Sequence, residues 1–390
     1  MRTRLVLLLM LRKLGYKGSR ADKKRILFNL ILISLVVAAL VFAQIFVVSM
    51  SRGIADKYAI LGDGHVQVHE GAGIQIPDDP SIVDVQLVAQ SYALIYSPSA
   101  NKMIRLKGVG PSYFNETRLA ELTLGEHFND PSSTLPKILV STTLAKSLHV
   151  AIGDKVALML VSQNSIRPQL CVIKNFYDSG YQELDSNLVF CDFALVDRLF
   201  NGKEDVYHEL LVEQGQDKRI KNQLVEKGYL ATTWDEENYA VAVNLNTSRQ
   251  AVLGVMVAVA MLCGYFISEL SREMVEDDKQ QIAMLGLLGG RKSMIRRVYF
   301  LAVIFVTLVS IAVGSCLGIL LADNLGGVLS LLAKRSIPLL SYYLLDFSVV
   351  LPVGDILLIL LVLFLVSMLS VRWSLRRVMR IEPLFCIHYD

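Results

Sequence analysis

The chain has 390 residues, of which 53% are apolar and only 19% charged, and its mean hydropathy is +0.46. These values exclude an ordinary soluble domain and indicate several membrane helices beside a sizeable polar part. The formal net charge of +3 is uninformative as a total, whereas its distribution along the chain is informative. Five cysteines in a chain of this length exclude a scaffold held together by disulfides.

The N-terminal 25 residues are basic and carry a short apolar stretch, Leu5–Leu14. This stretch is too short to cross a bilayer, so we expect residues 1–25 to form a cytoplasmic, interfacial helix on the inner leaflet. The apolar run that follows, from Ile26 to about Ser49, is too long for a signal-peptide core and has no small-residue cleavage site. It is therefore predicted to be a retained membrane anchor.

Four apolar runs are long enough to span a membrane as helices: Ile26–Ser49, Ala251–Ile267, Val298–Ala322 and Val349–Val371. The second run is short and is expected to extend upstream through Ala240–Leu245, and Asn244–Gln250 is expected to form a helical stalk above the membrane. The predicted fold class is a membrane α-helical protein with four transmembrane helices and a large mixed α/β domain between helices 1 and 2. The predicted domains are residues 1–25, helix 1 at 26–50, the large domain at 51–250, and a part at 251–390 that contains the other three helices.

Lysine and arginine flank these spans unevenly. Residues 1–25 hold nine of them, the loop after the second span holds six, and the tail at 372–390 holds four. Because basic residues remain on the cytoplasmic side, both termini are predicted to be cytoplasmic and the large domain external. Residues 51–250 hold 18 basic and 25 acidic residues, a balance of −7, which gives no reason to expect nucleic-acid binding.

The large domain alternates short β-rich runs with helix-like pieces, separated by turn signals such as Asp63-Gly64. The predicted strands are His65–His69, Ala93–Tyr96, Lys155–Val161 and Leu170–Phe176. The predicted helices are Ser81–Gln90, Thr142–His149 and Phe193–Phe200.

The residues that suggest chemistry have simpler explanations. His65 and His69 are about 13 Å apart along a strand and cannot share one metal ion, so they are expected to point outward while Val66 and Val68 point inward. The acidic cluster Glu273, Glu276, Asp277, Asp278 indicates a solvated helix face. Hydrolase motifs are absent, and we expect no catalytic residues and no metal site.

Cys171 and Cys191 lie near the ends of two probable strands joined by a hairpin-like turn. An oxidising compartment would permit a disulfide between them, and separate burial as two small apolar side chains is the alternative.

The membrane helices contain two further patterns. Gly254 and Ala258 in the second span, and Ser310, Gly314 and Gly318 in the third, recur every fourth residue, which favours a close interface between these two helices. The first span carries bulky side chains toward its outer end, and it either lines an opening that admits an acyl chain or faces lipid as an anchor. Its candidate contacts are Phe42, Ile45, Phe46 and Val48.

The segment GLLGGRKS, residues 286–293, comes close to a phosphate-binding loop. The pattern requires a second glycine where this chain has Arg291, and no buried strand precedes the segment. Ile282, Leu285, Leu288 and Ile295 recur at near-helical spacing instead. The segment is therefore predicted to be a helical piece that binds no ATP.

Taken in order, these elements resemble the permeases of MacB-type ABC transporters, and the external motifs are similar to the LolC/LolE-type lipoprotein-releasing branch. The similar stretches are Asn175–Phe190, Ala194–Phe200, Ile138–Val156 and Lys107–Pro111, together with the tail. The resemblance implies that the stretch at about 272–297 is a coupling helix that docks on a separate ATPase subunit. Gln281 and Gly286 stand where the family has glutamate and arginine, which weakens or re-aims polar contacts there. The implied contact residues are Gln281, Ile282, Met284, Leu285, Leu288, Gly289 and Arg291.

The resemblance also implies a function and partners. The chain would be a multi-pass protein of a bacterial inner membrane with its large domain in the periplasm. It would extract lipoproteins for an external acceptor, paired with a second copy or a paralogous permease. ATP and magnesium would be bound by a LolD-like ATPase subunit and no cofactor by this chain. A MacB-like exporter of peptides or drugs and an FtsX-like mechanotransmission scaffold are the alternatives.

Overall fold

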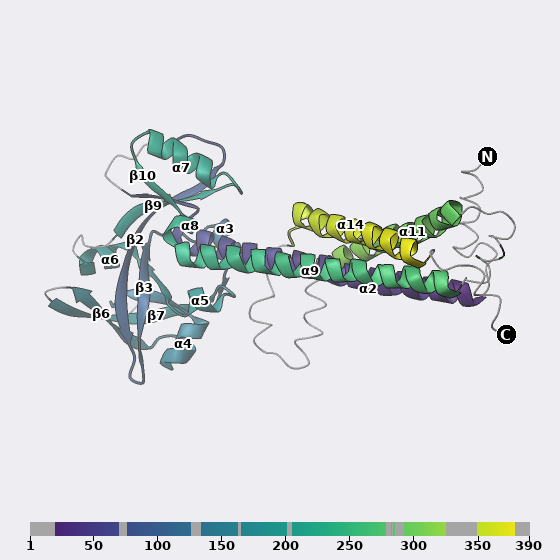
Figure 1. Cartoon of the computed structure of the whole chain (residues 1–390). Coiled ribbons are helices and arrows are strands. Elements are labelled where there is room, and N and C mark those ends of the chain that lie inside the picture. Colours follow the sequence, from purple (N-terminus) through teal and green to yellow (C-terminus); the bar gives the residue numbers. More distant parts are fainter. Residues whose placement is uncertain are drawn as a thin grey trace. The chain divides into compact units, whose positions relative to one another are not determined.

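A computed structural model describes residues 20–69, 76–125, 134–162, 165–200, 205–277, 282, 284, 292–324 and 349–378 (Figure 1). The described residues divide into two compact units. The first contains residues 20–50, 246–324 and 349–378, and the second contains residues 51–245. The predicted interfacial stretch Leu5–Leu14 and the end of the tail lie outside the described residues.

The first unit is built on long apolar helices. They are α2 (Arg20–Lys57), α9 (Tyr239–Asp277), α11 (Lys292–Asp323) and α14 (Val353–Val378). Each contains a segment long and apolar enough to cross a membrane, so the structure has four candidate spans at the predicted places. α9 begins upstream of its apolar run, as expected. Pro352 directly precedes α14, a position where its missing N–H costs nothing.

The core of the first unit lies between these helices. Val37, Val41 and Ile45 of α2 are buried together with Ile359 and Leu363 of α14. Ala260 and Ile267 of α9 and Tyr299 and Val303 of α11 complete the same cluster. The helices are therefore apolar on the side that faces their neighbours as well as on the side left for lipid, as expected for membrane helices.

The second unit is a mixed α/β domain. Its ten described strands form one sheet in the order β10-β1-β9-β2-β3-β8-β5-β7-β4, with β6 paired to β2 and β7. The strands are β1 (Val66–His69), β2 (Ile82–Tyr96), β3 (Asn101–Val109), β4 (Thr123–Leu124), β5 (Lys137–Ser141), β6 (Lys155–Ser162), β7 (Ser165–Asp178), β8 (Leu188–Asp192), β9 (Asp205–Val212) and β10 (Leu230–Thr233). The helices are η1 (Tyr58–Asp63), α3 (Glu116–Ala120), α4 (Thr142–Leu148), α5 (Gln182–Asp185), α6 (Phe193–Phe200), α7 (Asp217–Glu226) and α8 (Trp234–Glu237).

Two apolar clusters hold the sheet to its helices. The larger one joins β2, β3, β5 and β8 to α4 and α6, with Leu144, Leu148 and Val196 among its buried residues. The smaller one places Ile220 and Leu224 of α7 against β1, β9 and β10. α4 and α6 begin at the predicted positions, and Ser141 caps α4 by accepting a hydrogen bond from the N–H of Leu144.

Two local predictions are wrong. Residues Ser81–Gln90, predicted as a helix, lie mainly in the long strand β2, which pairs with β9 on one edge and β3 on the other. Tertiary pairing of both strand edges has outweighed the local pattern there. The turn between Cys171 and Cys191 is not a hairpin, because β5 lies between β7 and β8 and pairs with both.

Candidate functional site

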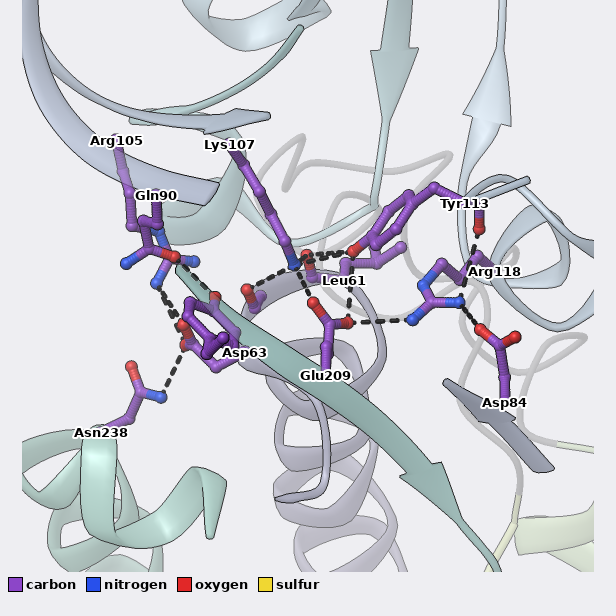
Figure 2. A network of polar contacts seen from close by, with 12 residues as sticks. Leu61, Asp63, Asp84, Gln90, Arg105, Lys107, Tyr113, Arg118, Glu209 and Asn238 are labelled. Atoms are coloured by element: carbon purple, nitrogen blue, oxygen red, sulfur yellow. Dashed lines mark hydrogen bonds and ion pairs between the residues drawn. The ribbon is translucent and has the colours of Figure 1, made fainter. Parts of the chain in front are cut away.

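A buried cluster of polar and charged residues gathers around η1, the π-helical turn that continues α2 (Figure 2). Such turns are rare and frequently mark functional positions. Two cations of β3, Arg105 and Lys107, lie two residues apart and therefore on the same face of the strand. Both reach η1, and we call this cluster the junction.

Lys107 holds the backbone at the end of η1. Its Nζ donates hydrogen bonds to the carbonyl oxygens of Leu61 and Gly62 at 3.0 and 2.7 Å, and to the hydroxyl of Tyr113 at 2.7 Å. Burial lowers the pKa of Lys107 to about 8, and the carboxylate of Glu209 opposes that effect. The ammonium group thus acts as a buried donor for helix carbonyls that have no partner within η1.

Glu209 of β9 links Lys107 to Arg118 of α3. Its Oε2 lies 2.7 Å from Lys107 Nζ and its Oε1 lies 3.0 Å from Arg118 Nη2. Arg118 also forms an ion pair with Asp84 and lies over the ring of Tyr113, 4.1 Å from its centroid. These partners outweigh the effect of burial and keep the pKa of Arg118 above its usual value.

Arg105 and Asp63 form the second half of the junction. Arg105 Nη1 donates to both carboxylate oxygens of Asp63, at 2.9 and 3.0 Å. Asn238, directly before α9, donates from Nδ2 to Asp63 Oδ2 at 2.8 Å. Burial would raise the pKa of Asp63, but Arg105 and Lys107 hold it below its usual value. Asp63 therefore connects the end of η1, the strand β3 and the start of α9.

Gly64 follows Asp63 and has a positive φ of 75°. A Cβ atom at this position would lie 2.3 Å from Cγ of Glu209. Glycine is therefore needed at position 64 of the predicted Asp63-Gly64 turn for two reasons: the positive φ and the close approach of Glu209.

The charged groups of the junction are paired with one another and enclosed. What the arrangement does is fix two helix ends to a sheet. A cavity of about 290 Å³ lies beside it, lined by Tyr58, Tyr92, Met103, Ile104, Arg105, Leu184, Asn187 and Asn238.

The junction was missed from the sequence, although a signal was present. Arg105 and Lys107 alternate with Ile104 and Leu106 in one short strand, and Glu209 directly precedes the apolar run 210–212 within its strand. Charges inside strands that are otherwise apolar predict buried partners. The sequence could not tell which cation would meet which carboxylate.

The small-residue face of α11 packs against α2, not against α9 as expected. A Cβ atom added at Gly314 would lie 2.6 Å from the carbonyl oxygen of Ser34, and one at Gly318 would lie 2.8 Å from that of Ala38. Ser310 donates to the carbonyl of Leu30 at 3.3 Å. Gly254 of α9 has open space around it and Ala258 is exposed. A regular spacing of small residues predicts a close helix–helix contact, but which helix is the partner depends on how the four helices assemble.

The predicted acyl-chain contacts on α2 divide into two groups. Ile45 and Val48 are 1% and 6% exposed and face the other helices. Phe42 and Phe46 are half-buried, and their rings are stacked with centroids 6.4 Å apart. Phe42 and Phe46 are thus the two of the four that remain accessible at the surface of this unit.

Most of the predicted ATPase contacts, namely Gln281, Leu285, Leu288, Gly289 and Arg291, lie outside the described residues. Ile282 packs against the core of the first unit and Met284 is 58% exposed. Gly286, where the sequence departs from the family, also lies outside the described residues.

The histidines and cysteines of the domain have structural surroundings. Val66 and Val68 are fully buried, and His65 and His69 are partly exposed, as predicted. Cys171 and Cys191 are free, buried thiols in the larger core, and burial raises the pKa of Cys171 to about 12. Among the described residues, no group of three or more potential ligands could hold a metal ion.

Comparison with known proteins gives the class first. Residues 253–383 match the family model described as FtsX-like permease C-terminal, a range that contains the helices α11 and α14. This match points to a membrane subunit of a transporter.

The particular resemblance to LolC/LolE-type permeases is confirmed by two relatives named "lipoprotein-releasing system transmembrane protein LolC". The protein from Xylella fastidiosa (strain Temecula1 / ATCC 700964) is 23% identical over 336 residues, covering 80% of this chain and 79% of the relative. The one from Haemophilus influenzae is 23% identical over 397 residues, covering 96% and 97%. Among solved structures, the extracellular domain of the ABC-type transporter YknZ from Gram-positive bacteria is 10% identical. It covers 43% of this chain and 97% of its own length, with a TM-score of 0.28.

Proposed function

We propose that this chain is the permease subunit of an ABC transporter that extracts lipoproteins from a bacterial inner membrane and passes them to a periplasmic acceptor. The observation that carries the proposal is the similarity to LolC relatives along 80–96% of the chain, on a protein with four spanning helices. Residues 51–245 lie in the periplasm in this proposal, since the basic residues gather at the opposite ends of the spans.

The energy for extraction has to come from a partner. Each buried CH₂ of an acyl chain holds a lipoprotein in the bilayer by about 0.8 kcal/mol, so several long chains cost tens of kcal/mol to remove. We assign this work to a separate, LolD-like ATPase with its own ATP and magnesium. It docks at the stretch 272–297, through Gln281, Ile282, Met284, Leu285, Leu288, Gly289 and Arg291.

The junction provides a physical route for the motion. Lys107 and Arg105 hold the end of η1, and Asn238 connects Asp63 to the start of α9. A displacement of either helix end is therefore transmitted to β3 and the sheet without passing through a flexible loop. In this proposal ATP binding moves the helices, and the domain moves with them.

Photo-crosslinking tests the cargo assignment. Crosslinkers at Phe42 and Phe46, and at the more buried Ile45 and Val48, should capture a lipoprotein in membranes depleted of ATP and lose it when ATP is added. Leu35 lies on the same helix and is 65% exposed, so a crosslinker there is the matched control that should capture lipid only.

Depletion of the protein gives the second readout. Lipoproteins destined for the outer membrane should accumulate in the inner membrane. Normal lipoprotein sorting with altered drug sensitivity would favour a MacB-like exporter. Blocked cell separation would favour an FtsX-like scaffold, and either outcome would refute the lipoprotein proposal.

A further inference from the structure

Three polar side chains from three membrane helices meet at the end where α14 begins. Gln44 of α2 donates from Nε2 to Oδ2 of Asp355 at 3.1 Å. Arg249 of α9 donates from Nη2 to the same oxygen at 2.9 Å. Charged side chains in membrane helices are costly and are retained mainly where they have a task.

Asp355 is stabilised at this position by more than its two partners. It is the third residue of α14, in the first turn, where the helix dipole is positive. The carboxylate thus has three sources of stabilisation: the helix end, the Gln44 amide and the Arg249 guanidinium. Loss of one of them leaves two.

The side-chain amide of Gln44 stabilises the carboxylate of Asp355. Gln44 has no exposed surface, and its Oε1 has no hydrogen-bond partner among the described residues. The hydrogen bond to Asp355 is therefore the contact that distinguishes glutamine from an apolar side chain of the same length. A buried amide that served only to fill space would be replaced by such a side chain at no loss.

The two contacts of Asp355 differ in how easily they open. The α2–α14 contact is reinforced at Ser49, whose Oγ accepts from the N–H of Val350 at 2.9 Å. The side chain of Arg249 is 44% exposed, whereas that of Asp355 is 21% exposed. An exposed ion pair is weak and is exchanged readily for water.

Farther along, α9 is tightly joined to α14. A Cβ atom at Gly264 would lie 2.9 Å from Cβ of Val366, and Ser268 donates to the carbonyl of Ser370 at 3.1 Å. Between this contact and Arg249, one face of α9 is exposed at Gly254, Val255 and Leu262, whereas Leu253, Met256 and Val257 pack against the core of the first unit. A pivot of α9 about Gly264 would let its Arg249 end leave α14 while these three side chains part from the core.

We propose that the Arg249–Asp355 ion pair is a latch that closes one end of α9 against α14, and that Gln44 holds the carboxylate while the latch is open. Opening widens the access to α2 near Phe42 and Phe46, the proposed acyl-chain contacts. Only that last step rests on the proposed function, since the latch itself is a property of the helix bundle.

Spin-label distances in the full-length protein test the latch. Nitroxides at Asn246→Cys and Gly354→Cys, both exposed positions, report the separation of α9 and α14 in nanodiscs by pulsed electron resonance. The exposed Cys316 and the tail cysteine Cys386 are first replaced by serine. The labelled protein with Arg249 and Asp355 intact should give mainly the short distance between the two nitroxides. Asp355→Asn should raise the ratio of long to short distances by roughly 5- to 30-fold, the effect of losing one modest interaction.

Two further variants separate a latch from a merely structural contact. Gln44→Met removes the group that holds the open carboxylate, so it should lower the population of the long distance, opposite to Asp355→Asn. The swap Arg249→Asp with Asp355→Arg should restore the short distance, because the Gln44 amide can turn its free carbonyl to the new guanidinium. Gln250→Ala, an exposed neighbour, is the matched control and should change nothing.

The proposal is overturned if Asp355→Asn leaves the distance distribution unchanged, or if Gln44→Met and Asp355→Asn shift it in the same direction. The spin-label measurement needs no lipoprotein. It can therefore refute the latch without refuting the lipoprotein function, which the crosslinking and depletion experiments test.

Discussion

Nζ of Lys107 lies 2.7 Å from Oε2 of Glu209, and neither side chain has any surface exposed to solvent. This pair sits at the centre of the junction, where Lys107 also binds the last carbonyls of η1. A buried ion pair of this kind adds little net stability over apolar residues, but removal of one partner is costly because the other charge is left buried. The Lys107–Glu209 pair therefore fixes the end of η1 relative to β3 and β9.

Lys107→Met should therefore destabilise the second unit by about 3–5 kcal/mol. The charge of Glu209 would then be met only by Arg118 and Tyr113. Thermal unfolding followed by the fluorescence of Trp234, in a Trp373→Phe background, measures this unit. Lys102→Met, a partly exposed lysine of the same strand, is the control. The double variant Lys107→Met, Glu209→Leu should recover part of the loss, and no recovery would show that the cost does not come from the uncompensated carboxylate.

Gly64→Ala should also destabilise this unit, by at least about 1 kcal/mol, because alanine does not adopt a positive φ without strain. The added Cβ would in addition displace Glu209. Gly110→Ala, where a Cβ meets nothing within 4 Å, should be neutral in the same melting experiment. Equal effects at the two glycines would contradict the close approach at Gly64.

In the membrane unit, Gly314→Ala should weaken the α2–α11 contact by about 1–3 kcal/mol, the usual effect of overpacking a tight interface. Gly254→Ala is the matched control, since the space around Gly254 is open. A disulfide scan between α2 and α11 in membranes would detect the change. Strong cross-linking of α11 to α9 instead would show that the small-residue face has a different partner.

The pH dependence of stability should carry a signature of Asp185. Burial raises the pKa of this carboxyl group to about 7, against hydrogen bonds from Ser179 that lower it. Between about pH 4 and 7 the folded protein binds a proton that the unfolded chain does not, so this group favours folding increasingly as the pH falls through 7. The wild type should gain stability relative to Asp185→Asn between pH 8 and pH 5. A constant difference across that range would refute the raised pKa.

Asn238→Leu should uncouple ATP hydrolysis from lipoprotein release. It removes the hydrogen bond that connects Asp63 to the start of α9 and leaves the Arg105–Asp63 pair intact. ATP hydrolysis by the assembled transporter should continue while lipoprotein release falls. Asn238→Asp should be worse than Asn238→Leu, since it sets two carboxylates side by side. Unchanged release in Asn238→Leu would remove this contact from the transmission route.

The sequence alone determined the four spans and the mixed character of the domain, because long apolar runs, basic flanks and caps such as Ser141 act locally along the chain. It also marked the close-packing face at Ser310, Gly314 and Gly318, since small side chains at helical spacing permit close approach in any bundle. Only the tertiary structure decided that this face meets α2, that Ser81–Gln90 joins the sheet as part of β2, and that Arg105, Lys107, Asp63 and Glu209 form one cluster. Each of these outcomes depends on contacts between segments far apart in the chain, and the free energy of a strand edge or a buried charge is set by the partner that the fold brings to it.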